Sequence, residues 1–206
     1  MRGFRLLPVA ASAVCTCLFL AGPVVPGWIV SAAPPRSSEA GAEKGEKRES
    51  LVGKLPPELQ VEKWFNSKPL TLAKDLRGRV VLLDFAFPSP KVVPGLMQFK
   101  SKLARQGFEI IGFMNRADPQ IENFVTKMNL NYVVVRDDDG IEGGENGQYG
   151  KTWKAYGIPQ SVDPRFPKDD YDGPTAFLID RSGKVRWEGR SADLKEDALK
   201  ALLTAK

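Results

Sequence analysis

Histidine is absent from this sequence, and its 206 residues include two cysteines, Cys15 and Cys17. Both cysteines lie in an uncharged run, residues 6–35, that follows two arginines. We predict a signal peptide over residues 1–32 with cleavage after Ala32, because a short apolar centre is followed by prolines and small residues. An uncleaved membrane anchor is the alternative, since the run is long enough to span a bilayer. In either case we expect the folded part to be periplasmic or secreted.

Without the signal, the chain has neither a thiol nor an imidazole. This absence excludes a zinc site built on cysteine, a histidine general base, a Ser-His-Asp or Cys-His nucleophile, and a disulfide. Carboxylate, lysine or tyrosine catalysis, an oxygen-ligand metal site and a pure binding role remain. We predict that the protein uses no cofactor.

The charge balance makes some partners less plausible than others. The full chain has 30 basic and 25 acidic residues, and the predicted signal removes Arg2 and Arg5. The remaining balance is too even to predict binding to nucleic acid or to an anionic membrane. We therefore expect no nucleic-acid partner, and no membrane contact unless the N-terminal segment stays uncleaved.

The rest of the chain divides into a linker and one domain. Residues 33–50 contain no large apolar residue, so they cannot bury enough surface to offset the entropy of ordering, and we predict a disordered linker. From Leu51 onward apolar residues recur regularly, and about 155 residues suffice for one compact core. We predict a single domain over residues 51–206.

The first half of the domain has the pattern of alternating strands and helices. Val80–Phe85 is nearly all apolar, which is typical of a strand covered on both faces. The segments that follow are a helix over Leu96–Gln106, a strand over Phe108–Met114, a helix with Asp118 as N-cap and a strand over Tyr132–Val135. In the second helix Ile121, Phe124, Val125 and Met128 form one apolar face.

The second half adds a hairpin and a closing helix. Thr175–Asp180 and Val185–Glu188 flank a four-residue turn with glycine, which predicts a β-hairpin. A short helix is expected around residues 149–156. A last helix is expected with Asp193 as N-cap and with Leu194, Ala198, Ala201, Leu202 and Ala205 toward the core. This order predicts an α/β fold with a central mixed β-sheet flanked by helices.

Several of these segments resemble the exported thioredoxin-like proteins of the TlpA and redoxin type. The matching stretches are DLRGRVVLLDF (75–85), IIGFMN (110–115), NLNYVVVRDDDG (129–140), KAYGI (154–158) and GPTAFLIDRSGKVRWEG (173–189), in the order of the family. The most specific piece is Gly173-Pro174-Thr175, which matches the family's cis-proline loop. The resemblance implies a thioredoxin-like fold from about Leu51 to the C-terminus.

The resemblance also implies a Trp-Cys-x-x-Cys segment after the first strand, where one thiolate attacks a disulfide and the second thiol resolves it. This chain has no cysteine there. The two cysteine positions fall on Pro90 and Val93 when counted forward from Asp84, or on Ala86 and Ser89 when counted back from Pro94. Both alignments remove the dithiol, and a serine hydroxyl cannot form the mixed disulfide.

From the resemblance we predict that the former active-site surface binds an extended peptide or an exported protein. The candidate binding residues are Phe87, Ser89, Pro90, Lys91, Gly173, Pro174 and Thr175. In dithiol relatives the cis-proline loop pairs with extended substrate through backbone groups, a mode that needs no thiol. The long loop of residues 158–172 would lie beside this surface, either for recognition or as a plain insertion.

Other candidate sites have simpler interpretations. The stretch 137–147 is acidic and glycine-rich but fails the spacing of an EF-hand calcium loop, so we predict a solvated turn and no metal site. Asp84 resembles the family's buried acidic residue and is expected to be a hydrogen-bonded aspartate at a strand end. A Ser-Lys pair at Ser89 and Lys91 lacks an oxyanion site. Trp64, Trp153 and Trp187 are expected to be packing residues.

These patterns predict an exported protein of thioredoxin fold that has no redox cysteines and no catalytic residues. Its expected role is a peptide-binding, protein-binding or scaffold module. The alternative is a redoxin-family thiol-disulfide oxidoreductase or antioxidant protein that borrows a thiol from glutathione or from a partner. A structural domain of a larger assembly is a third possibility.

Overall fold

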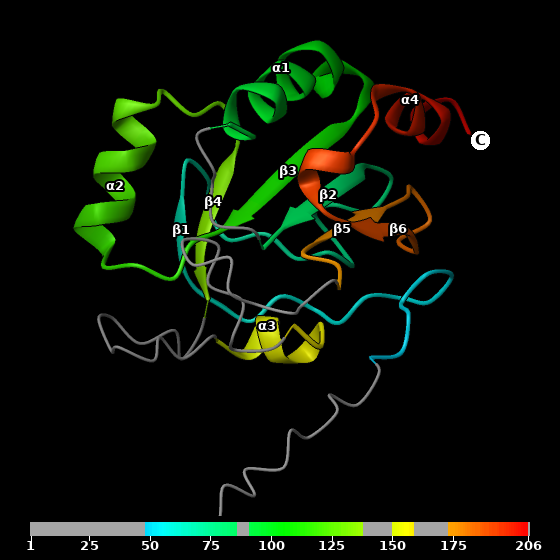
Figure 1. The fold of residues 1–206 in the computed structure, drawn as a ribbon, viewed down its shortest axis with the longest axis horizontal. Helices are drawn as coiled ribbons and strands as arrows, with labels where there is room; N and C mark the ends of the chain where they lie inside the picture. The colour runs from blue at the N-terminus through cyan, green and yellow to red at the C-terminus, as the bar shows by residue number, and fades with distance from the viewer. Residues whose placement is uncertain (1–47, 86–90, 138–149, 159–172, 206) are drawn as a thin grey trace, which may run out of the picture. The chain divides into compact units, whose positions relative to one another are not determined.

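Six β-strands form a mixed sheet in the order β1-β4-β3-β2-β5-β6 (Figure 1). The structure is a computed structural model that describes residues 48–85, 91–137, 150–158 and 173–205. The strands are β1 (Val61–Phe65), β2 (Val80–Asp84), β3 (Phe108–Phe113), β4 (Val133–Asp137), β5 (Ala176–Ile179) and β6 (Val185–Gly189). Strands β2, β3 and β4 are parallel, whereas β1, β5 and β6 each pair antiparallel with a neighbour. The predicted α/β fold with a mixed sheet is confirmed.

Helices cover both faces of this sheet (Figure 1). Residues of α1 (Val93–Leu103), α2 (Asp118–Lys127) and α4 (Glu196–Thr204) pack on one face, and α3 (Lys151–Ala155) packs on the other. All five residues of β2 are buried, because successive side chains of a strand point to opposite faces and both faces are covered. Val80 and Leu82 join the core beneath α1, here the α1 core. Val81 and Leu83 join the core on the other face, here the α3 core.

Helix α1 begins three residues earlier than predicted. Pro94 occupies its first turn, where the missing N–H of proline costs no hydrogen bond. Val93, Leu96 and Leu103 are its buried residues. The predicted C-terminal end is a separate 3₁₀ turn, η1 (Ala104–Gln106), and Gly107 terminates it with a φ of 88°.

Helix α2 has the predicted apolar face but not the predicted cap. Ile121 and Val125 are buried, and Phe124 and Met128 pack against the same core. The N-cap prediction for Asp118 is wrong, because Ala117 precedes the helix and Asp118 lies within the first turn. An acidic side chain there is still favoured by the positive end of the helix dipole.

Helix α4 differs from its prediction in start and in phase. Asp193 lies in a 3₁₀ turn, η2 (Ser191–Asp193), and α4 begins only after Lys195, so the Asp193 N-cap prediction is wrong. Leu194 is buried as predicted. Within the helix, however, Leu199 and Leu203 are buried, whereas the predicted core residues Ala198, Ala201 and Ala205 are exposed and Leu202 is half-buried.

Strand β1, which the sequence analysis did not predict, adds an edge to the sheet by pairing with β4. The chain leaves β1 through Asn66, whose φ is 60°. The side-chain amide of Asn66 donates to the carbonyl oxygens of Leu130 and Tyr132 at 3.0 and 3.2 Å. Asparagine suits this position because its short polar side chain offsets the cost of a left-handed backbone.

Arg48 to Ser50, which the prediction placed in the linker, are described and contact the domain. The guanidinium of Arg48 pairs with Glu188 at 2.7 Å and lies 5.3 Å from the ring centroid of Phe177. Gly157, with a φ of 65°, approaches Arg48 so closely that a Cβ would lie 2.6 Å from the Cδ atom. The predicted signal and the rest of the linker lie outside the described residues.

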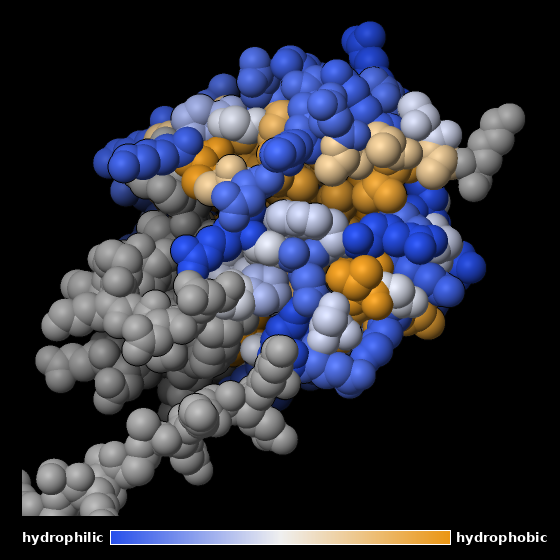
Figure 2. Space-filling model, turned by 45° about the vertical axis from the view of Figure 1, so that its right-hand side comes forward, coloured by the Kyte–Doolittle hydropathy of each residue, from blue (hydrophilic) through white to orange (hydrophobic). Residues whose placement is uncertain are grey.

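The face of the domain seen in Figure 2 is mostly hydrophilic. Figure 2 shows hydrophobic residues as a band across the upper part of the view and as smaller islands below it. Val52 and Leu55 are large apolar side chains with high exposure, 48% and 70%. Among the helices of the described residues, none has both the length and the apolarity needed to cross a bilayer.

Candidate functional site

The predicted binding surface lies at the carboxyl ends of the parallel strands. Asp84, the last residue of β2, pairs with Gly112 of β3 on one side and with Ala176 of β5 on the other. One residue further, the N–H of Phe85 donates to the carbonyl oxygen of Thr175 at 2.8 Å. The chain just before β5 therefore lies beside the end of β2, as the sheet order requires.

The structure places four of the seven predicted binding residues. Gly173 and Pro174 precede β5, and Thr175 is buried with its N–H donating to the carbonyl oxygen of Gly189 at 2.9 Å. Lys91 is exposed, two residues before α1. Phe87, Ser89, Pro90 and residues 159–172 of the long loop lie outside the described residues.

Val93 is one of the positions that align with the family's cysteines. It is the first residue of α1, and its side chain is fully buried in the α1 core. A thiol there would be inside the core, out of reach of a disulfide substrate. The other aligned positions, Ala86, Ser89 and Pro90, lie outside the described residues.

Asp84 is buried at the end of β2, with 3% of its surface exposed. The hydroxyl of Ser191, in the turn before α4, donates to Asp84 Oδ1 at 2.5 Å. A buried carboxylate is costly unless hydrogen bonds satisfy it. The prediction of a hydrogen-bonded aspartate at the strand end is confirmed, whereas Ser191 carries no sequence signal that would have identified it as the donor.

Tyr132 brings a phenol close to the same buried carboxylate. Burial raises the pKa of Tyr132 above its ordinary value, and the negative charge of Asp84 raises it further. The aromatic ring lies over Gly112, where a Cβ would be 3.3 Å from Cε2 of the tyrosine. Burial and the charge of Asp84 both favour the neutral phenol over the phenolate.

Asn115, two residues beyond the end of β3, has a buried side-chain amide. Within the described part of the chain, neither its Nδ2 nor its Oδ1 has a hydrogen-bond partner, although both atoms are shielded from solvent. A buried polar group left unpaired costs about 1–3 kcal/mol. The sequence analysis placed this residue inside a matching stretch but gave it no role.

An aromatic cluster supports this end of the sheet from the α3 core. The ring of Phe85 stacks on Phe113 with centroids 4.2 Å apart, and it meets Phe177, Trp153 and Tyr156 at 5.8, 5.4 and 5.0 Å. Trp153 is a core residue, and Trp64 and Trp187 pack partly buried against the cores. The prediction that the three tryptophans are packing residues is confirmed.

Asp137, the described residue of the acidic stretch, stabilises the fold. Asp137 is fully buried, and its carboxylate accepts hydrogen bonds from the N–H groups of Thr152 and Trp153 at 3.1 and 3.0 Å, at the start of α3. Among the residues described, no three His, Cys, Asp or Glu side chains come together to hold a metal ion. The rest of the stretch, residues 138–147, lies outside the described residues.

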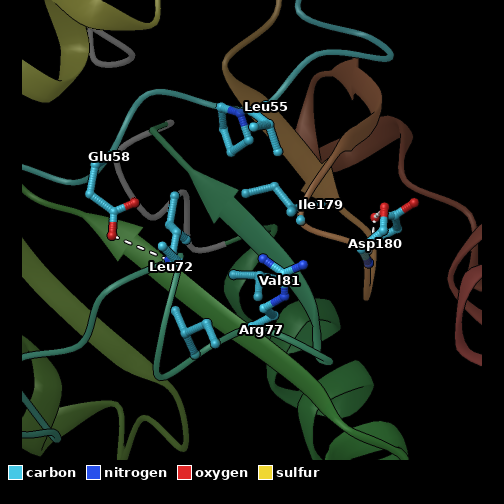
Figure 3. A pocket seen from close by; sticks show the side chains of 12 residues that line it. Leu55, Glu58, Leu72, Arg77, Val81, Ile179 and Asp180 are labelled. Atoms are coloured by element: carbon cyan, nitrogen blue, oxygen red, sulfur yellow. Dashed lines mark hydrogen bonds between the residues drawn. The ribbon is translucent and has the colours of Figure 1, made fainter.

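Two pockets lie toward the other end of the parallel strands, where these strands begin. One, of about 150 Å³, has Leu55, Leu72, Arg77, Val81 and Ile179 in its walls (Figure 3). The other, of about 340 Å³, is lined by polar groups that include Asn66, Arg79, Lys100, Glu109 and Tyr132. The sequence analysis predicted neither, because each pocket combines residues from separate loops.

Comparison with known proteins gives a consistent family assignment. The sequence profile of the AhpC/TSA family matches residues 52–188. The thiol-disulfide oxidoreductase ResA of Bacillus thuringiensis subsp. konkukian is 32% identical over 158 residues, which cover 74% of this chain and 76% of that protein. ResA of Bacillus anthracis is 30% identical over 145 residues, covering 68% and 70%.

Solved structures agree on the fold. A thioredoxin-like superfamily protein is 25% identical with a TM-score of 0.53, covering 74% of this chain and 97% of its own. A thiol-disulfide isomerase from Corynebacterium glutamicum is 22% identical with a TM-score of 0.52, covering 73% and 97%. The predicted thioredoxin-like fold is confirmed.

Proposed function

We propose, from the premise that this chain belongs to the AhpC/TSA family, that it binds an extended peptide or protein segment and performs no thiol-disulfide exchange of its own. The absence of cysteine after Cys17 carries this proposal. Disulfide exchange needs a thiolate that attacks the disulfide and a thiol that resolves the mixed disulfide. Neither group exists in the domain, and no other side chain can replace sulfur in that step.

The end of the sheet next to Pro174 supports a binding role. Phe85 and Gly189 hydrogen-bond to both backbone groups of Thr175, which fixes the chain at the start of β5. Gly173 and Pro174 continue this chain beyond the paired strand, where an extended segment can add by backbone hydrogen bonds. The unpaired amide of Asn115 lies at the same end, one strand beyond β2.

The proposed function is carried out outside the cytoplasm. The support is the N-terminal segment, which combines arginines, an apolar centre and small residues before position 33. An intact mass of the protein recovered from an export-competent host tests this part. A mass lacking residues 1–32 supports a cleaved signal, and a full-length mass in the membrane fraction supports an anchor.

Insulin reduction by dithiothreitol tests the absence of thiol chemistry. The full chain and its Cys15→Ser/Cys17→Ser variant are assayed in parallel, so that any activity of the N-terminal cysteines is separated from the domain. We expect the double variant to leave the rate at that of dithiothreitol alone. Acceleration by the double variant would contradict the proposal.

Peptide binding is tested with reduced and alkylated insulin B chain, an extended peptide without a free thiol. In ¹⁵N-labelled protein we expect its addition to shift the amide signals of Lys91, Gly173 and Thr175, and to leave those of the distant turn residues Ser182 and Gly183 in place. Pro174→Ala should weaken the binding about tenfold, whereas Pro69→Ala, at an exposed proline elsewhere, should not. Shifts spread evenly over the domain, or none, would favour a purely structural domain.

A second candidate is an oxidoreductase or antioxidant protein that uses a borrowed thiol. The thiol-disulfide oxidoreductase activity in the name of the ResA relatives favours it. It predicts turnover of a disulfide or peroxide only when glutathione is supplied, above the rate of glutathione alone, and loss of that turnover in Pro174→Ala. The same rate with and without the protein would exclude this candidate.

A further inference from the structure

We propose that the edge of the sheet opposite Pro174 docks on an anionic membrane surface. In this proposal Arg77, Arg105, Arg181 and Lys184 contact lipid head groups, and Val52 and Leu55 insert between the lipids. We call these six residues the basic edge. The net charge of the chain gave no sign of it, because its cations come from three separate turns that the fold brings together.

Hydrogen bonds between the turns define this edge. Strands β2 and β3 are parallel and β5 is antiparallel to β2, so the starts of β2 and β3 meet the end of β5. The N–H of Gly78 donates to the carbonyl oxygen of Arg181 at 3.1 Å, and the N–H of Val80 donates to that of Gly107 at 3.0 Å. The guanidinium of Arg181 closes the group by donating to the carbonyl oxygen of Gln106 at 3.1 Å.

The cations of the basic edge are not neutralised by carboxylates. Arg77, Arg105 and Lys184 are exposed, and within the described residues their side chains form no ion pair. The guanidinium of Arg181 donates to a carbonyl oxygen. Because that oxygen has no net charge, the positive charge of Arg181 is not compensated.

Most acidic groups nearby have hydrogen-bond partners within the domain. Glu58, which lines the pocket of Leu55 and Arg77, is exposed and accepts from the N–H of Ala73 at 3.4 Å. Asp180 accepts from Arg186 Nε at 2.5 Å and from the N–H groups of Ser182 and Lys184. Glu109 is buried and paired with Lys100 at 2.5 Å and with Arg79 at 3.4 Å. The carboxylate of Asp75 accepts from the N–H and the hydroxyl of Thr71 at 2.8 and 2.9 Å. Glu58 and Asp75 keep their negative charge, so the four cations of the basic edge are in excess over these two exposed carboxylates.

The most exposed large apolar side chains of the described residues belong to the same edge. Gly53 donates to the carbonyl oxygen of Val185 at 2.8 Å, and Val185 donates to that of Lys54 at 3.0 Å. These bonds hold Val52 and Leu55 against the start of β6, next to the turn that carries Lys184. Leu55 and Arg77 line the same small pocket (Figure 3).

Exposed apolar side chains beside uncompensated cations match the requirements of an anionic bilayer. Each lysine or arginine near such a surface contributes about 1 kcal/mol, and apolar side chains add affinity by burial at the head-group boundary. A bilayer offers anionic head groups to the cations and, directly beneath them, an apolar layer to Val52 and Leu55. Docking through the basic edge would also turn the Pro174 end of the sheet toward the aqueous phase, where a peptide could reach it.

A fluorescent label inside the basic edge tests the proposal on the full chain. In the Cys15→Ser/Cys17→Ser background, Leu55→Cys provides a single thiol for an environment-sensitive dye. Vesicles containing one third phosphatidylglycerol are compared with pure phosphatidylcholine vesicles. The N-terminal segment is the same in all protein variants, so differences between the variants do not arise from it. We expect a blue shift of the dye with the anionic vesicles alone, reversed by 0.5 M salt.

Two matched charge variants complete the test. Arg77→Gln/Arg105→Gln/Lys184→Gln should raise the concentration of anionic lipid needed for half of the shift by roughly 100-fold. Lys127→Gln/Lys154→Gln/Lys195→Gln removes the same charge from exposed lysines elsewhere and should leave the titration unchanged. Equal effects of the two variants, a shift with neutral vesicles, or tighter binding to soluble polyglutamate than to vesicles would overturn the proposal. Circular dichroism verifies that both variants are folded.

Discussion

The hydroxyl of Ser191 donates a 2.5 Å hydrogen bond to the buried carboxylate of Asp84, across 107 positions of sequence. The bond joins the turn before α4 to the last residue of β2. This contact ties two elements of the fold together.

Replacing Ser191 by alanine should destabilise the domain by about 1–3 kcal/mol, because a buried carboxylate would lose one of its donors. Urea unfolding followed by fluorescence would measure the change at pH 7. Ser182→Ala is the control, because it removes a solvent-exposed serine–aspartate hydrogen bond, to Asp180 at 2.6 Å, in the turn after β5. An effect no larger than that of the control would mean that the bond to Asp84 is not formed in solution.

The stability should depend on pH through Asp118. Hydrogen bonding to Lys63 holds the pKa of Asp118 below its usual value, partial burial opposes this, and Arg136 adds to the lowering. A carboxylate with a lowered pKa stabilises the fold fully above its unfolded pKa of about 4, and this contribution is lost as the pH falls through the folded pKa. Asp118→Asn should therefore be less stable than the wild type at pH 7, with the difference shrinking below pH 4.

Unfolding midpoints in urea at pH 7, 4 and 3 would follow this difference. Asp197→Asn removes an exposed carboxylate from the first turn of α4 and serves as the control, since it has no ion pair among the described residues. A constant difference between Asp118→Asn and the wild type over the whole range would contradict the prediction.

Arg48→Ala should destabilise the domain by about 1–3 kcal/mol, because the ion pair with Glu188 is mostly buried and its loss leaves a carboxylate without its cation. Burial raises the pKa of Glu188, but Arg48 and the N–H of Leu51 hold it below its usual value. We therefore expect that pKa to rise in the variant, which NMR titration would detect. Lys54→Ala breaks an exposed pair with Glu49 and should leave the midpoint unchanged.

A thiol introduced at position 93 should be inert. In the Cys15→Ser/Cys17→Ser background, Val93→Cys should react with a disulfide reagent at least about tenfold more slowly than Lys91→Cys, because residue 93 is buried and residue 91 is exposed. Stopped-flow absorbance gives both rates. Equal rates would place residue 93 at the surface and reopen the alignment in which it replaces a cysteine.

The sequence predicted those parts of the fold that depend on local patterns. Strand β2, apolar except for Asp84, and the hairpin of β5 and β6 were recognisable from a hydrophobic run and from a glycine turn. The phase of α4 was not, because Asp193 resembles a cap while the chain makes a 3₁₀ turn first. Strand β1 was missed because its five residues, VEKWF, form a short segment of mixed polarity. Only its pairing with β4 identifies this segment as a strand.

The candidate site was predictable to a similar extent. The neighbours Gly173, Pro174 and Thr175 stood out through their resemblance to a known loop. Ser191 and Asn115 did not, since a serine or an asparagine is common and its importance arises from tertiary contacts alone. The basic edge likewise depends on three turns that are distant in the sequence.

The contacts of Arg48 also decide how the domain would respond to a mechanical load. Its ion pair with Glu188, together with the hydrogen bonds of Gly53 and Lys54 to Val185, fastens the first described residues along β6. A force applied to the chain before Arg48 would therefore reach β6 first, at an edge of the sheet, and would have to break these contacts before it strained β2. Tension on the N-terminal segment would thus be taken up at β6 before it reached β2.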